Sequence, residues 1–137
     1  MSKMIGAGIS AKAETESQGK GIAYWTVTLL LAAAITLSGI GQLMQLGGNI
    51  ELVTNLGYPL YVMTILGIWK VLGAVALVVP GFPRLKEWAH AGIFFLMTGA
   101  AFSHALANDS GFSIILPLSY AALNIASWAL RPKSRRL

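Results

Sequence analysis

One lysine, Lys70, lies near the middle of a long apolar stretch, where there is no water to hydrate its ammonium group. A lysine at the centre of a membrane-spanning helix costs about 2.5 to 3.5 kcal/mol on insertion scales, so such residues mark ligand pathways or tie helices together. Lys70 is about ten residues, or on the order of 15 Å, from both Pro59 and Pro80, which is further than a side chain reaches. We therefore expect Lys70 to face a protein interior. Antiparallel helices would bring three hydroxyl groups to its depth: Thr36, Thr98 and Tyr120.

A second candidate, His104, lies about one turn inside the end of its apolar stretch and could exchange protons near neutral pH. Gln42 lies at a similar depth in another stretch, and the adjoining loops carry Glu51 and Asp109. Lys70, His104, Gln42 and Tyr120 therefore define a candidate ligand pocket, with Glu51 and Asp109 at its outward opening. In the alternative interpretation, these side chains only hold the helices together through hydrogen bonds.

Several kinds of chemistry are disfavoured. The chain has no cysteine, so it forms no disulfide, thiolate nucleophile or iron–sulfur cluster. His90 and His104 are 14 residues apart, about 21 Å along a helix, so they cannot ligate one metal ion or one haem. Nothing resembles a phosphate-binding glycine loop or a nucleic-acid-binding module. We expect no metal site, no cofactor held by the chain's own motifs and no nucleic-acid partner.

The elements that would position these residues are membrane-spanning helices. Of the 137 residues, 55% are hydrophobic and only 11% are charged, whereas a soluble domain has about 25% charged residues. We expect an all-α integral membrane four-helix bundle over residues 21–131, with a short surface helix between the first two spans. The predicted spans are residues 22–46, 59–79, 88–107 and 112–130.

The two ends of the chain differ in character from the spans. Residues 1–20 are polar and lack a sustained helical period, which favours a disordered tail, and residues 132–137 form a basic tail. A cleaved signal peptide is disfavoured because the first apolar stretch is too long and starts too late. Every lysine and arginine except Lys70 falls in the two tails or in the loop between the second and third spans. The positive-inside rule therefore predicts that both termini are cytoplasmic.

Four motifs resemble the DoxX-like family of small four-span bacterial membrane proteins. They are residues 56–61 (LGYPLY), 66–74 (LGIWKVLGA), 85–92 (LKEWAHAG) and 99–104 (GAAFSH), and the resemblance covers about residues 24–132. It implies a four-helix bundle in the bacterial cytoplasmic (inner) membrane. It also implies that Lys70, Glu87 and His104 occupy the charged and polar motif positions. Family members usually carry tyrosine at the position of His90.

The resemblance leaves the reaction open, because one fold hosts many functions. Relatives are described as quinone-linked membrane subunits in sulfur or thiosulfate oxidation, as partners in oxidative-stress complexes or, more distantly, as assembly factors. Our first hypothesis is a membrane subunit associated with a quinone-linked oxidoreductase, with quinone as the ligand. The alternative is a noncatalytic scaffold or assembly partner that docks other membrane proteins. Transport of a small anion is less favoured, since the spans lack a central carboxylate for ion coupling.

Overall fold

The computed structural model describes residues 1–137 and is entirely helical. Four helices are long and apolar enough to cross a membrane, which confirms the predicted all-α membrane bundle. They are α1 (Ser2–Leu43), α3 (Tyr61–Val78), α4 (Pro83–Leu106) and α5 (Gly111–Ala129). The predicted surface helix is α2 (Asn49–Asn55), and a short 3₁₀ helix, η1 (Lys133–Arg135), follows α5.

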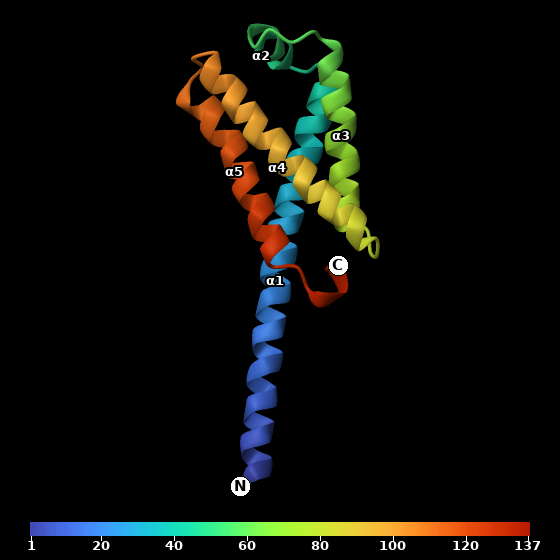
Figure 1. The fold of residues 1–137 in the computed structure, drawn as a ribbon, viewed down its shortest axis with the longest axis vertical. Coiled ribbons are helices and arrows are strands. Elements are labelled where there is room, and N and C mark those ends of the chain that lie inside the picture. Colours follow the sequence, from blue (N-terminus) through green and yellow to red (C-terminus); the bar gives the residue numbers. More distant parts are fainter.

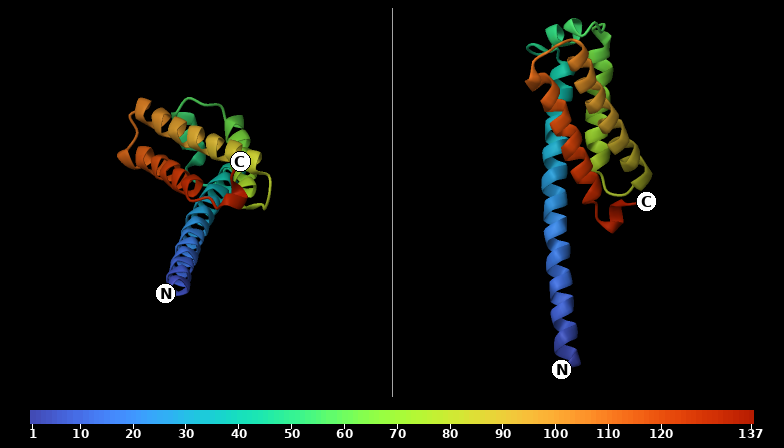
Figure 2. Two further views of the ribbon diagram at one scale, coloured as in Figure 1. Left: turned by 60° about the horizontal axis from the view of Figure 1, so that its bottom comes forward. Right: turned by 60° about the vertical axis from the view of Figure 1, so that its left-hand side comes forward.

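The four long helices form two antiparallel pairs, α1 with α3 and α4 with α5 (Figure 1). The pairs meet where α1 packs on α5 and α3 packs on α4. Helix α2 lies across one end of the bundle beside the α4–α5 turn, and we call this the loop end (Figure 2). The opposite end, which we call the basic end, holds the α3–α4 connection and the C-terminal residues. The buried apolar core draws on all four helices: Leu31, Ile35, Leu77, Ile93, Met97 and Ala121.

Helices α1 and α3 approach each other closely through a pair of glycines. A Cβ atom added to Gly39 would lie 3.0 Å from the carbonyl oxygen of Gly67 and 3.0 Å from Cβ of Lys70. A Cβ atom added to Gly67 would lie 2.8 Å from the carbonyl oxygen of Gly39. Small residues that let backbones touch are the usual means of helix association in membranes. This crossing sets which residue of α1 lies opposite Lys70.

The start of α4 differs from the expectation. The sequence predicts a loop for Arg84, Lys86 and Glu87, but the three residues lie in the first two turns of α4, which begins at Pro83. Proline at the first position of a helix has a suitable φ and lacks only an amide hydrogen that would be unpaired there. The connection is tight, and Gly81 and Phe82 both adopt positive φ, of 76° and 52°. The three charged side chains are therefore held by helical backbone and not by a loop.

The N-terminal segment also differs from the expectation of a disordered tail. Helix α1 begins at Ser2, and residues 1–20 extend well beyond the bundle as one continuous, fully exposed helix (Figure 1). Alanine, lysine, glutamate and methionine are good helix formers, and the spanning part of α1 supplies an already formed turn from which the helix propagates. The hydrophobic period that signals an amphipathic helix is absent because nothing packs against this segment.

Candidate functional site

Lys70 lies inside the bundle on α3, with 8% of its surface exposed. Its Nζ donates a hydrogen bond to Oγ of Ser38 on α1, at 2.9 Å. This partner differs from the three expected hydroxyl groups, because the close glycine crossing places Ser38 directly opposite Lys70. Thr98 donates instead to the carbonyl oxygen of Phe94 within its own helix. Tyr120 packs against the apolar core and makes no hydrogen bond to Lys70.

Gln42 is buried one turn beyond Ser38 on α1, so the two share a helix face. Its Oε1 is enclosed and accepts no hydrogen bond. The ammonium group of Lys70 has three donors, and only one of them makes a hydrogen bond. We call Ser38, Gln42 and Lys70 the α1–α3 polar group. A buried polar atom without a partner costs about 1 to 3 kcal/mol, so this group has hydrogen-bonding capacity that the protein itself leaves unused.

His104 forms a second group at the loop end. Its Nδ1 lies 2.7 Å from Oδ2 of Asp109. The chain turns back after α4 at Asn108, which has a left-handed φ of 55°, and the amide of Asp109 donates to the carbonyl oxygen of His104. Since a carboxylate only accepts, Nδ1 carries the hydrogen, and Nε2 of a neutral ring remains an acceptor.

Asp109 and Glu51 line the same small hollow, of about 210 Å³, between α2 and the start of α5. Its remaining lining is mostly polar: Gly48, Leu52, Asn55 and Ser113. We call Glu51, His104 and Asp109 the loop-end group. Glu51 and Asp109 thus line one polar hollow, but none of Lys70, His104, Gln42 and Tyr120 lines it.

The two groups are not one compact pocket. Ile93 of α4 lies opposite Gly73 of α3, and at 1.5 Å per residue His104 is about 12 Å nearer the loop end than Lys70. The predicted pocket of Lys70, His104, Gln42 and Tyr120 therefore separates into the α1–α3 polar group, the loop-end group and a tyrosine in the core. Neither of the two best-defined hollows is lined by any of these four residues.

Two buried cations complete the C-terminal end of α3, and the sequence reasoning missed both roles. Lys86 donates to the carbonyl oxygens of Ala76, at 2.9 Å, and Val79. Arg135 of the C-terminal segment donates to the carbonyl oxygens of Leu77, at 2.9 Å, and Val78, at 3.2 Å. Carbonyl groups of the last helical turn have no partner within the helix and carry partial negative charge, which cations stabilise. The available sequence signal was Pro80, which follows an apolar helix and is itself followed within six residues by Arg84 and Lys86.

Glu87 also serves the basic end. Its carboxylate accepts a hydrogen bond from Nε1 of Trp128, at 3.0 Å, and forms an ion pair with Arg131. These contacts join α4 to the end of α5. Burial lowers the pKa of the Arg131 guanidinium from its ordinary value, and the neighbouring Arg136 lowers it further. Arginine nevertheless stays charged at physiological pH, so the ion pair persists.

Two further polar pairs cross between helices. The ring of His90 and the side chain of Asn124 are 2.8 Å apart, and Asn124 also donates to the carbonyl oxygen of His90, at 2.8 Å. The hydroxyl groups of Thr28 and Ser127 lie 2.6 Å apart and join α1 to α5. In each pair the two side chains are buried and contact each other, which is the arrangement expected of interhelical packing.

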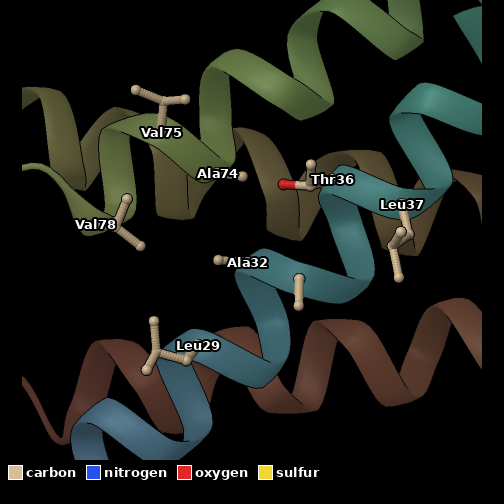
Figure 3. A pocket seen from close by; sticks show the side chains of 8 residues that line it. Leu29, Ala32, Thr36, Leu37, Ala74, Val75 and Val78 are labelled. Carbon is tan, nitrogen blue, oxygen red and sulfur yellow. The ribbon is translucent and has the colours of Figure 1, made fainter.

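An open apolar groove of about 420 Å³ runs between α1 and α3 on the surface of the bundle (Figure 3). Small side chains leave the space, and larger ones form its margins. The lining residues are Leu29, Ala32, Ala33, Thr36, Leu37, Ala74, Val75 and Val78. We call this hollow the α1–α3 groove.

The loop-end group offers few ligands to a cation, because no three histidine, aspartate or glutamate side chains come together as a metal-binding cluster.

Comparison with known proteins gives one result. A model of the DoxX-like family matches residues 26–127. No curated protein and no solved structure gives a match. The matched range covers the four bundle helices from the second half of α1 to two residues before the end of α5.

Proposed function

The chain belongs to the DoxX-like family and is a multi-pass integral membrane protein, and on this premise we propose that it serves as a membrane subunit of a quinone-linked oxidoreductase. The proposal includes residence in the bacterial cytoplasmic membrane with both termini in the cytoplasm. The supporting observation is the unused hydrogen-bonding capacity of the α1–α3 polar group, where Oε1 of Gln42 has no partner.

A quinone headgroup offers the hydrogen-bonding groups that these residues lack, an acceptor for Lys70 and, in its reduced form, a donor for Gln42. Its carbonyl oxygen would accept a hydrogen bond from a free donor of Lys70, and the hydroxyl group of the reduced form would donate to Oε1 of Gln42. The bound group would supply two-electron chemistry in concert with the partner enzyme. Neither well-defined hollow reaches these residues, so the helices around them would have to separate to admit the ring.

His104 and Asp109 would handle protons nearer the loop end. The hydrogen bond from Nδ1 to Asp109 orients the ring, so Nε2 points away from the carboxylate and is free to accept a proton and later release it. Asp109 is a positioning residue in this scheme, and Glu51 makes the opening of the hollow more negative.

Binding of a short-chain quinone to the purified protein in lipid nanodiscs tests the proposal. We expect Lys70→Met and Gln42→Leu to weaken binding about 10-fold or more, the usual effect of losing a hydrogen bond in a buried site. Lys20→Met and Gln18→Leu remove the same side-chain types from the exposed part of α1 and should leave binding unchanged. Full-strength quinone binding by Lys70→Met would overturn the proposal.

A noncatalytic role as a scaffold or assembly partner is the second candidate. The observation that favours it is the pairing of His90 with Asn124 and of Thr28 with Ser127, which shows that polar residues of this bundle serve packing. A scaffold predicts that Lys70→Met lowers recovery of a co-purifying membrane protein without changing any turnover. Cross-linking in the native membrane followed by purification distinguishes the two candidates.

A further inference from the structure

The α1–α3 groove leads directly into the cluster of cations at the basic end. Leu29 and Val78 lie together at one end of the groove (Figure 3). Trp25 is one turn before Leu29 on α1, and Ala33 is one turn after it, so these three share a helix face. The lipid-facing surface therefore continues without a break from the groove to Trp25.

Arg135 stands at that end of the groove. Its guanidinium group lies 4.5 Å from the ring centre of Trp25 and donates to the carbonyl oxygen of Val78. Because Arg135 neutralises the partial negative charge of the end of α3, this end of the groove does not repel an anion. The same segment exposes Lys133 and Arg136, and α1 exposes Lys20 one turn before Tyr24.

Neither Lys133 nor Arg136 forms an ion pair with an acidic side chain. Glu87 is paired with Arg131. Glu16 is one helical turn before Lys20 and offsets its charge, so Lys133 and Arg136 are the uncompensated cations at this end. The groove therefore joins an apolar channel to a positively charged rim at the level where a bilayer places its headgroups.

We propose that the α1–α3 groove and this rim bind one anionic phospholipid, with an acyl chain in the groove and the phosphate beside Lys133 and Arg136. The lining supports a hydrocarbon chain because seven of its eight residues are hydrophobic. Alanines at three lining positions leave a space suited to a single chain, which is much thinner than a helix of about 10 to 12 Å with side chains. The exposed cations select an anionic headgroup over a zwitterionic one.

Native mass spectrometry of the detergent-purified protein with added phosphatidylglycerol or phosphatidylcholine of identical acyl chains tests the headgroup. We expect one phosphatidylglycerol molecule to be retained preferentially. Lys133→Gln combined with Arg136→Gln should reduce the preference by about fivefold for each cation removed. Lys3→Gln combined with Lys12→Gln removes equal charge from the distant end of α1 and should leave the preference intact.

A second pair of variants tests the groove. Ala33→Phe fills it from an exposed position, and Ala122→Phe adds the same bulk to an exposed position on α5. Ala33→Phe should lower retention of both lipids, whereas Ala122→Phe should not. Equal retention of the two headgroups by the wild type would overturn the proposal. So would a dimer that Ala33→Phe dissociates, because a second copy of the chain would then occupy the groove.

Discussion

Buried polar side chains differ in how much of their hydrogen-bonding capacity is used. His90 and Asn124 are joined by two hydrogen-bonding contacts, so these residues hold α4 and α5 together. Lys70 and Gln42 retain free capacity inside the same bundle. This difference is invisible in composition, because both groups consist of polar residues on apolar helices. It separates residues that hold the fold from residues able to receive a ligand.

Replacing Asn124 with leucine should lower the free energy of unfolding by about 1 to 3 kcal/mol, because both contacts to His90 are lost and a buried imidazole is left unpaired. The double variant His90→Leu/Asn124→Leu should be less destabilised than the sum of the single variants. Thermal or denaturant unfolding in detergent measures each effect. Ser119→Ala, at an exposed position on the same helix, is the control and should change little. Strict additivity would contradict the coupling.

At the scale of elements, two features decide how the helices fit together: the glycine crossing of α1 and α3, and the cation-bonded end of α3. The glycine crossing fixes the register that brings Ser38 to Lys70. The cations fix the position of the C-terminal segment, which returns to the bundle through Arg135. Each feature depends on contacts between segments far apart in the chain.

Gly39→Ala should destabilise the bundle by about 1 to 3 kcal/mol, since the new methyl group would lie 3.0 Å from a backbone oxygen of α3 that cannot move alone. Gly92→Ala is the matched control, because nothing lies within 4 Å of a Cβ atom added there. That change should be neutral or slightly stabilising through higher helix propensity. Unfolding of both variants in the same detergent gives the comparison, and equal effects would argue against a tight crossing.

Lys86→Met should lower the free energy of unfolding by about 1 to 3 kcal/mol, because two carbonyl groups at the end of α3 lose their donor. Arg84→Met removes the same charge from an exposed site in the same helical turn. Its effect on stability should stay within about 0.5 kcal/mol, as is usual for surface changes. A Lys86→Met protein as stable as the wild type would show that this hydrogen bonding contributes nothing.

At the scale of the whole molecule, four spans return the chain to its starting side, and the basic end holds the C-terminus beside the point where α1 enters the bundle (Figure 1). The loop end, by contrast, carries the hollow lined by Glu51 and Asp109. The basic end thus carries the cations, and the loop end carries two carboxylates. In a bilayer this division would orient the molecule through its cations.

Single cysteines can test that orientation because the natural chain has none. We expect Ser2→Cys and Ser134→Cys to be protected from a membrane-impermeant maleimide applied outside intact cells, since both termini are expected in the cytoplasm. Thr54→Cys, at an exposed position on α2, should react. Labelling of the two terminal positions after the cells are opened is the control. Opposite labelling of Ser2→Cys and Ser134→Cys would contradict an even number of crossings.

Hydropathy and helical period were sufficient to determine the number of spans, their approximate limits, the surface helix and the burial of Lys70, because these properties depend on residues close together in the chain. They were insufficient for residues 1–20, where helix forms without a packed face, and for the first turn of α4. Tertiary structure alone decided that Ser38 meets Lys70, that His104 stands apart from it and that Arg135 completes α3. These outcomes depend on the register between helices, which is set by contacts such as Gly39 against Gly67, residues that lie far apart in the sequence.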